Sequence, residues 1–396
     1  MTSREGIARS EGVRPSTDQR GGVGRAILFV SASGWLGGPG RSLLTLMANL
    51  PETPEMILVS PTNGDLLPAL RERSLRVTHI PLYRLRGPFG HPLGRLVAIM
   101  RMTSWIVRNR YRLSVIHANG FTELHLAALG ALLGRIRCVA WFHAYEVDPW
   151  DRRLGPVWGR LLSNRHFTAV SDLAREIVAE TGLARPDAIS IVPNPIDPRE
   201  VRTVKGALVD RSRSRRPPVV GYLGSCIRDK GFDLIPDIIR ESQDVAVRWA
   251  IFVPKPSAKD RAGTRSWAEL EALSVGGRVS FPGRKSDVRE AYRECDIVIC
   301  PSRRESFGRI AAEAMTNGLP VVASDIGPFR DLVGDAGLLF PSRDPASAAA
   351  GVRRLVKEPA LRHQLGRRGE ERAARFEPGP IVRRFAELYG LADVAA

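Results

Sequence analysis

Two glutamates stand eight positions apart in a stretch suited to binding a phosphorylated sugar. Glu305 and Glu313 flank the letters SFGR, in which Gly308 lets a ligand approach the main chain closely. Apolar side chains recur at helical spacing after this point, so the amides of the stretch are expected at a helix start. Such amides and the helix dipole attract phosphate, while carboxylates accept hydrogen bonds from hydroxyl groups. The alternative interpretation is a solvated loop glutamate and a surface ion pair between Arg309 and Glu313.

The elements that position the two glutamates follow from residues 296–322. The apolar run IVI at 297–299 is typical of a strand that is buried on both faces. The helix that follows the loop ends at the Asn-Gly pair 317–318, just before a proline. The run VVA at 321–323 then predicts the next parallel strand. Both glutamates therefore belong near the carboxyl end of a strand, where open α/β sheets bind their ligands.

The whole segment, PSRRESFGRIAAEAMTNGLPVVASDIGPFRDLV, resembles the donor-site signature of the retaining glycosyltransferases of GT-B fold, family 4. The resemblance extends over nearly the whole chain after its first residues. It implies an α/β fold in which two Rossmann-like, doubly wound domains face each other across a crevice. It also implies that Glu305 lies beside the donor sugar and that Glu313 binds the ribose. The amides of Phe307 and Gly308 are then expected at the sugar and phosphate.

A second segment resembles the family's diphosphate-binding pattern, G-R-x4-K-G. Lys230 and the glycine after it match that pattern, but Ser225 stands where the family has its arginine. The resemblance implies that Lys230 binds the donor diphosphate and takes part in catalysis. We expect Arg228, in the same turn, or Arg303 or Arg309, opposite it, to supply the missing positive charge.

Two further loops are expected to contact the donor. The resemblance places Gly37 and Gly38 at the donor phosphates and at the acceptor pocket. A nucleotide-hydrolase phosphate loop is excluded, because Trp35 and Arg41 replace the glycine and the lysine that such a loop requires. A tight strand–helix turn remains the alternative for the two glycines. Arg284 follows a strand end where the family seats the base, and its side chain is suited to stacking on that ring.

Two predicted buried strands each carry a histidine near the carboxyl end, His117 and His143. The family often has His-x-His here, and Asn119 occupies the second position, where it can still form neutral hydrogen bonds. His143 precedes Glu146 and Asp148 and is the better candidate for the acceptor side and for catalysis. His117 is assigned to the acceptor side as well, and a purely structural role fits it equally.

Composition predicts two domains of ordinary size, since the chain has 396 residues and a hydrophobic content of 43%. A basic tail with almost no apolar content, 1–24, is expected to be disordered. An acceptor-binding Rossmann-like domain follows at 25–204 and an Arg/Ser-rich linker at 205–217. The nucleotide-sugar-binding domain is predicted at 218–376. The resemblance implies that a final helix within 377–396 crosses back to the first domain.

Basic side chains outnumber acidic ones, 59 against 42, which gives a net charge of +17. This balance predicts anionic partners such as nucleotide phosphates or anionic lipid headgroups. Nucleic acid is not expected, because the arginines lack interleaved aromatic side chains. The four cysteines form no C-x2-C pair, which favours core thiols in a reducing compartment over a metal site. No apolar run is long enough to span a bilayer, so we expect a cytoplasmic protein.

Residues 93–112 predict a helix that lies on the inner face of the cell membrane. Three arginines, Arg95, Arg101 and Arg108, alternate with apolar side chains, and Trp105 adds apolar bulk. The apolar side chains that share one stripe of the helix are Leu93, Leu96, Val97, Met100 and Val107. An ordinary amphipathic helix that covers the sheet is the alternative interpretation.

Together, these features predict a retaining hexosyltransferase. It would move a sugar from a uridine or guanosine diphosphate sugar to a glycan, a lipid-linked acceptor or a small molecule. No metal or cofactor is expected, because Lys230 and helix amides can stabilise the leaving diphosphate and no Asp-x-Asp triplet occurs. One alternative is a nucleotide-sugar epimerase or phosphorylase of the same fold. The other is a basic membrane-binding or nucleic-acid-binding protein without catalysis.

Overall fold

The computed structural model describes residues 26–51, 54–82, 92–144, 146–162, 165–203, 216–257, 260–274 and 276–391. The predicted tail at 1–24 lies outside these ranges, as does the predicted linker except for its last two residues.

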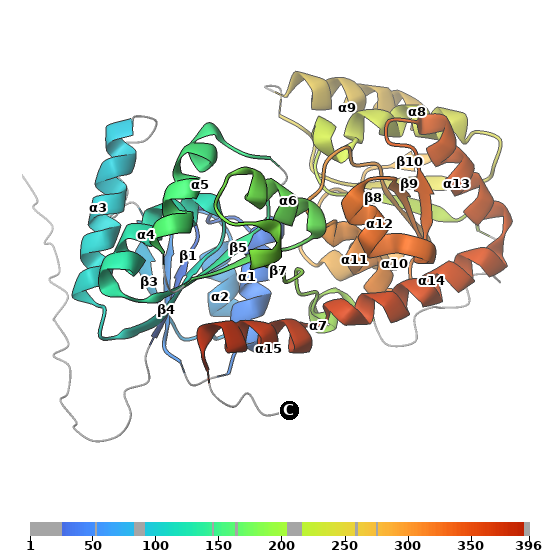
Figure 1. The fold of residues 1–396 in the computed structure, drawn as a ribbon. Helices are drawn as coiled ribbons and strands as arrows, with labels where there is room; N and C mark the ends of the chain where they lie inside the picture. Colours follow the sequence, from blue (N-terminus) through green and yellow to red (C-terminus); the bar gives the residue numbers. More distant parts are fainter. Residues whose placement is uncertain are drawn as a thin grey trace, which may run out of the picture.

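Two parallel sheets form the cores of two α/β domains (Figure 1). The first sheet has seven strands in the order β3-β2-β1-β4-β5-β6-β7. Its central strands are continuous apolar runs such as AILFV and MILVS, which are buried on both faces by flanking helices. The bounds are β1 (Ala26–Val30), β2 (Met56–Ser60), β3 (Val77–Pro81), β4 (Leu113–Ala118), β5 (Arg137–Phe142), β6 (Arg165–Ala169) and β7 (Ile189–Ile191).

The second sheet has six strands in the order β10-β9-β8-β11-β12-β13. All its strand pairs are parallel, as in the first sheet, so helices must connect successive strands. The bounds are β8 (Val219–Leu223), β9 (Arg248–Phe252), β10 (Val279–Ser280), β11 (Ile297–Cys300), β12 (Val321–Ser324) and β13 (Leu338–Phe340). The predicted strand–loop–helix–strand unit around the two glutamates is confirmed as β11, α11 and β12.

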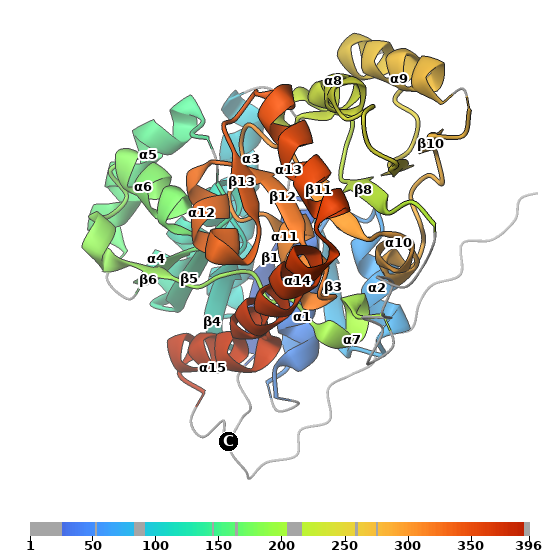
Figure 2. The same cartoon turned by 90° about the vertical axis from the view of Figure 1, so that its right-hand side faces the viewer.

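Helices cover both faces of each sheet (Figure 2). Those of the first domain are α1 (Gly38–Asn49), α2 (Leu66–Glu72), α3 (Pro92–Arg108), α4 (Phe121–Gly134), α5 (Pro149–Leu161), α6 (Asp172–Glu180) and α7 (Pro198–Val201). Those that follow are α8 (Ile235–Glu241), α9 (Arg261–Leu273), α10 (Val288–Glu294), α11 (Arg309–Thr316), α12 (Gly327–Val333), α13 (Pro345–Lys357), α14 (Pro359–Ala373) and α15 (Pro378–Tyr389). Short 3-10 turns include η4 (Arg228–Lys230) and η7 (Ala374–Phe376).

In both sheets the strand order reverses beside the first strand of the domain. The reversal lies between β1 and β4 in the first sheet and between β8 and β11 in the second. Loops that leave the carboxyl ends of strands at such a point diverge to opposite faces and leave a crevice for ligands. The topology therefore predicts a ligand site at the loops after β1, β8 and β11, which carry most of the predicted donor contacts.

The last helix, α15, packs against the first domain although it follows the second in sequence. Figures 1 and 2 both show it in red beside the first sheet, at the end of α14. Phe385 of α15 lies 4.8 Å from the ring of Trp141 in β5, and Arg137 donates a hydrogen bond to the Leu388 carbonyl at 3.1 Å. These contacts fasten the last helix of the chain to the first domain, as the resemblance implies.

Helix α3 packs on α4 through Ala98, Met102 and Ile106, which are buried. The stripe that the sequence predicts points the other way. Leu96 and Met100 are each 55% exposed, so this stripe does not cover the sheet. Within the described residues, the structure has no helix that is long and apolar enough to cross a membrane.

Candidate active site

A cavity of about 720 Å³ lies between the two domains. Its walls come from the loop after β1 and the start of α1 in the first domain. The second domain contributes the turn after β8, the loop after β11 and the first turns of α11. Most of the predicted donor residues line it: Gly37, Gly38, Ser225, Lys230, Arg284, Glu305, Phe307, Gly308, Arg309 and Glu313.

Lys230 and Glu305 form an ion pair across two loops of the second domain. The Lys230 ammonium donates to Glu305 Oε1 at 2.6 Å, and the Ser302 hydroxyl donates to the same oxygen at 3.2 Å. Gly231 makes the approach possible, because it has a φ of +69° and a Cβ there would lie 2.0 Å from the Pro301 carbonyl oxygen. The predicted lysine and the predicted sugar-binding glutamate are thus held side by side on the cavity wall.

The start of α11 is open to an anionic ligand. Gly308 is its N-cap, with a φ of +97°, and no side chain caps the first amides of the helix. A Cβ at Gly308 would meet the Phe329 ring at 2.5 Å, so only glycine fits this turn. Phe307 packs against Phe376 at 5.2 Å and fixes the loop. The backbone donors therefore face the cavity without a side-chain competitor.

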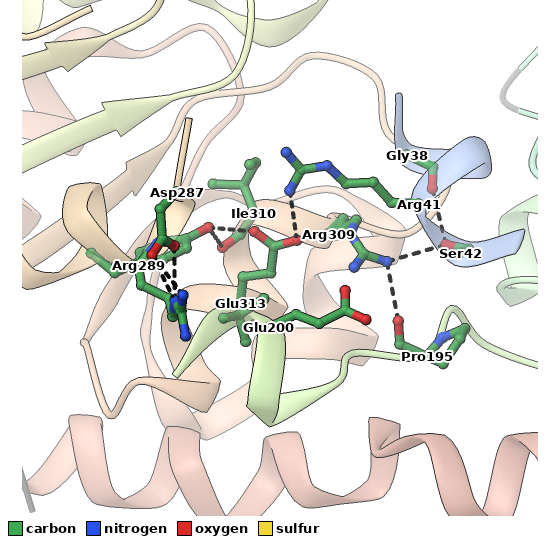
Figure 3. A network of polar contacts seen from close by, with 12 residues as sticks. Gly38, Arg41, Ser42, Pro195, Glu200, Asp287, Arg289, Arg309, Ile310 and Glu313 are labelled. Carbon is green, nitrogen blue, oxygen red and sulfur yellow. Dashed lines mark hydrogen bonds and ion pairs between the residues drawn. The ribbon is translucent and has the colours of Figure 1, made fainter. Parts of the chain in front are cut away.

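Glu313 is fully buried and held by groups from both domains (Figure 3). Its Oε2 accepts a hydrogen bond from the Tyr292 hydroxyl at 2.8 Å, and its Oε1 accepts one from Arg309 Nε at 2.7 Å. Arg41 of α1 approaches the same Oε1, with its Nη1 at 3.8 Å. The Arg309–Glu313 pair that the sequence suggests does form, but it is buried and is not the surface pair of the alternative interpretation.

Arg309 links the domains. It is 9% exposed, and its Nη1 donates to the Ser42 hydroxyl at 3.2 Å and to the Pro195 carbonyl at 3.1 Å (Figure 3). With Nε on Glu313, three of its five N–H donors bind protein groups. Arg309 lines the cavity, and these bonds hold its side chain against both domains.

The other two arginines proposed to replace the missing charge at Ser225 do not line the cavity. Arg303 forms two hydrogen bonds with the Asp233 carboxylate, at 2.5 and 2.9 Å, and a third with the Arg228 carbonyl. The Arg228 side chain is exposed. Ser225 itself lies on the cavity wall, where its carbonyl accepts a hydrogen bond from Tyr222 at 2.8 Å. In the arrangement that the structure shows, neither Arg228 nor Arg303 brings this charge to the cavity wall.

The two glycines after β1 and Arg284 lie on opposite walls. A Cβ at Gly37 or Gly38 would meet no atom within 4 Å, so their backbone is open to the cavity. The Arg284 side chain is 61% exposed, and its Nη2 lies 4.0 Å from Asp65 Oδ2 of the first domain. Its exposed guanidinium is suited to stacking on a flat ring, as the resemblance implies.

His143 lines the cavity, and Asn119 forms a hydrogen bond with its imidazole. His143 Nε2 lies 3.2 Å from Asn119 Oδ1, and the Asn119 amide donates to the Pro39 carbonyl at 3.5 Å. Burial, together with the nearby His117 and Arg309, lowers the pKa of His143 to about 3. The imidazole is therefore neutral near pH 7. Asn119, although it contacts this histidine, is not among the residues that line the cavity.

His117 does not lie on the acceptor side where the sequence places it. It is fully buried, and its Nδ1 is 2.8 Å from the Tyr389 hydroxyl of α15. The rings of Phe29 and Phe385 pack against it at 5.4 and 5.5 Å. Burial lowers its pKa to about 3, so it is a neutral core histidine. The structural interpretation therefore describes His117 correctly.

The cysteines and possible metal ligands lie as follows. Cys138, Cys295 and Cys300 are buried thiols that form no disulfide, and Cys226 lies on the cavity wall. Burial raises the pKa of Cys226 to about 11, which leaves it protonated. In the part of the chain that the structure describes, no three His, Cys, Asp or Glu side chains gather in a group able to hold a metal ion.

Two residues of the site were missed in the sequence. Tyr292 belongs to α10 and has no motif around it, so nothing in the sequence indicates its bond to Glu313. Arg41 was noted only as a departure from a phosphate loop. One feature of the sequence could have indicated its role: Arg41 stands three residues after Gly38, in the first turn of α1. Side chains of a helix tilt toward its N-terminus, so that of Arg41 tilts toward the cavity that Gly38 lines.

Two family models match separate parts of the chain. The model described as Glycosyltransferase Family 4 matches residues 36–200, which include β2 to β7. The model described as Glycosyl transferases group 1 matches residues 210–372, which include β8 to β13. The chain belongs to the family 4, group 1 glycosyltransferases. The family that the sequence predicts is confirmed, and with it the assignment to transferase enzymes.

This glycosyltransferase is similar in sequence to D-inositol 3-phosphate glycosyltransferases. The protein of that name from Streptomyces bingchenggensis is 26% identical over 72% of this chain and 63% of its own length. The one from Kineococcus radiotolerans is 27% identical over 72% of this chain and 68% of its own length. The chain thus spans about two thirds of these relatives.

Solved structures confirm the GT-B fold. Anabaena Alr3699/HepE, in complex with UDP and glucose, superimposes with a TM-score of 0.76 at 20% identity and covers 93% of this chain and 100% of its own. A glycosyltransferase from Rickettsia africae has a TM-score of 0.77 at 16% identity and covers 92% and 97%. At these identities the likeness shows the fold alone.

Proposed function

We propose that this glycosyltransferase transfers a sugar from a nucleoside diphosphate sugar to an acceptor, with retention of anomeric configuration. One observation carries the proposal: Lys230, Glu305, Glu313 and the uncapped start of α11 converge on a single cavity. A cation, open amides and two carboxylates match a diphosphate joined to two polyhydroxylated rings. The Anabaena protein of the same fold was solved in complex with UDP and glucose, which supports the same donor class.

The donor would lie with its diphosphate at the start of α11 and its ribose at Glu313. Glu305 would then accept hydrogen bonds from the sugar hydroxyls on the other side of Lys230. As the bond to the sugar breaks, negative charge grows on the diphosphate, and the Lys230 ammonium and the α11 amides stabilise it. The chain's own groups thereby do the work that a divalent cation performs in other transferases.

The acceptor would enter from the first domain, beside His143 and the open backbone at Gly37 and Gly38. A neutral imidazole can accept a hydrogen bond from an acceptor hydroxyl without repelling the donor sugar. The names of the relatives favour a phosphorylated cyclitol among small-molecule acceptors. Glycan and lipid-linked acceptors fit the same entrance.

Thermal unfolding in the presence of nucleoside diphosphates and nucleotide sugars tests the donor assignment, because a ligand of this cavity stabilises the folded protein. The panel requires uridine and guanosine series, since nothing on the cavity wall selects one base. A protein that is stabilised by none of them would overturn the proposal.

We also propose that the exposed face of α3 docks on an anionic membrane. Leu96 and Met100 are 55% exposed and Val97 is 38% exposed, while the exposed arginines Arg101 and Arg108 lie along one edge of this strip. An apolar strip beside cations fits the boundary between headgroups and acyl chains. The same helix is fixed to the protein by its opposite face, so docking requires no rearrangement.

The start of α3 lies beside the start of α5, which follows the cavity residue His143 in the chain. The Arg95 guanidinium of α3 lies 5.2 Å from the Trp150 ring at the start of α5, and Arg153 lies 5.8 Å from the same ring. Trp150 follows the cavity residue His143 by seven positions. Docking on the inner face of the cell membrane would therefore bring a lipid-linked acceptor near the crevice.

Replacing Arg95, Arg101 and Arg108 with glutamine is expected to release the protein from anionic vesicles, since each basic residue near the surface contributes about 1 kcal/mol. Sedimentation with neutral vesicles and with vesicles rich in phosphatidylserine measures the bound fraction. The control replaces Arg185, Arg265 and Arg354, exposed arginines of other elements, with glutamine. Equal recovery of the unaltered protein in the supernatant from both vesicle types would contradict membrane docking, as would a loss of binding equally large in the control.

A further inference from the structure

The second domain lacks a cation at the position where the family has its arginine. Ser225 brings no charge to the cavity wall, and Arg303 is bonded to Asp233 outside it. Of the two diphosphate-binding cations in the family pattern, only Lys230 is present in this turn. Arg309, the remaining candidate, is 9% exposed and is bonded to Glu313, Ser42 and Pro195.

Across the crevice, Arg41 of α1 presents a guanidinium whose donors are unused. Its side chain is 32% exposed on the cavity wall, and within the described residues it donates no hydrogen bond. Among the residues that the structure describes, its one ionic contact is Nη1 to Glu313 Oε1 at 3.8 Å, beyond hydrogen-bonding distance. Glu313 does not depend on it, because Arg309 and Tyr292 each donate a hydrogen bond to one of the carboxylate oxygens.

The other cations on the cavity wall are placed differently. Lys255 pairs with Glu271 at 2.8 Å, and Lys285 pairs with Glu294 at 3.0 Å. Both pairs join these lysines to side chains on α9 and α10. Arg41 instead lies beside the proposed ribose-binding carboxylate, about one helical turn along α11 from the open amides.

We propose that Arg41 is the second diphosphate-binding cation of this enzyme and takes the place of the arginine missing at Ser225. This inference rests on the proposed donor site. A guanidinium presents paired donors that match phosphate oxygens, and the flexible side chain need move only about one helical turn to reach the start of α11. The open backbone of Gly37 and Gly38 leaves room for a phosphate beside it.

As a consequence, side chains from both domains bind the diphosphate. In the family pattern the arginine and the lysine lie in one turn of the second domain. Here the lysine belongs to the second domain and Arg41 to the first, so the donor binds fully only when the domains are as close as the Arg41–Glu313 contact places them. Donor binding and domain closure are thereby coupled through one side chain.

The test is the affinity of the Arg41→Gln variant for uridine, UMP and UDP and for the guanosine series, measured by calorimetry. The affinity for the nucleoside diphosphate should fall roughly tenfold or more, because a charge-assisted bond to phosphate is lost. The nucleoside should be affected little. If Arg41 served only as a partner of Glu313 beside the ribose, all members of a series would weaken equally, and the proposal would be overturned.

A second variant keeps the proposal testable if the first disturbs the fold. Adding Ser225→Arg to the Arg41→Gln variant returns a guanidinium to the family position, and it should restore the affinity for the nucleoside diphosphate. Arg71→Gln, an exposed arginine of α2 outside the cavity, should leave it unchanged. If the unaltered protein binds no nucleotide of either series, the donor site itself is overturned. If it binds and Arg41→Gln binds the diphosphate equally well, the assignment of Arg41 alone is overturned.

Discussion

Replacing Lys230 with alanine is expected to lower turnover by a factor of about 10² to 10³, the usual effect of removing one donor that stabilises developing charge. The diphosphate gains negative charge as the sugar leaves, so the ammonium binds the transition state more strongly than the bound donor. In the structure this ammonium is poised on the cavity wall, 2.6 Å from Glu305. Steady-state kinetics should therefore show a fall in kcat larger than the rise in KM.

Two comparisons separate this role from simple binding. Lys230→Arg keeps the charge and should retain more turnover than Lys230→Ala, although the fork of donors fits the site less well. Lys357→Ala, an exposed lysine of α13, should behave like the unaltered enzyme. A raised KM with an unchanged kcat in Lys230→Ala would make the lysine a passive anchor of the donor.

Glu313→Gln is expected to weaken the binding of the nucleoside diphosphate by about 1.5–3 kcal/mol, because a charged acceptor for the ribose hydroxyls is lost. The carboxylate is fully buried and faces the cavity beneath the helix start. Calorimetric titration with the free nucleoside diphosphate measures the effect. This substitution should cost less turnover than Lys230→Ala, since the ribose gains no charge in the reaction.

Tyr292→Phe provides a matched control for this substitution. It removes the 2.8 Å bond to Glu313 Oε2 but leaves the carboxylate and its bond to Arg309 in place. The free energy of unfolding should fall by about 1 kcal/mol, while nucleotide affinity should change less than in Glu313→Gln. An unaltered affinity in a folded Glu313→Gln protein would reduce Glu313 to a structural partner of Arg309.

The local architecture of the site was predictable because its signals are local. An apolar run, a glycine-containing loop, helical spacing and an Asn-Gly stop all lie within the 27 residues from 296 to 322. They fix β11, α11 and β12, and with them the relative positions of Glu305 and Glu313. Likewise, the buried strands of both sheets are visible as apolar runs, since each is covered by helices on both faces.

Contacts between the domains were not predictable in the same way. Arg309 meets Ser42 and Pro195, which lie 267 and 114 positions away, and no periodicity encodes such a pairing. His117 and His143 both lie near the carboxyl ends of neighbouring strands, but His117 pairs with Val139 and so lies deeper in the sheet. There α15, returning from the end of the chain, buries it. The direction of the α3 stripe was likewise open, because helical spacing identifies a stripe without saying which side faces the protein.

The central claim is that the cavity between the domains binds a nucleoside diphosphate sugar, and thermal unfolding with the nucleotide panel tests it most directly. At a ligand concentration of about one hundred times Kd, the free energy of unfolding should rise by about 2.7 kcal/mol. We expect this shift for at least one nucleoside diphosphate and its sugar, and a smaller shift for Lys230→Ala and Glu313→Gln at the same concentration. A panel in which no nucleotide stabilises the protein, or in which both variants are stabilised as much as the unaltered chain, would contradict the claim.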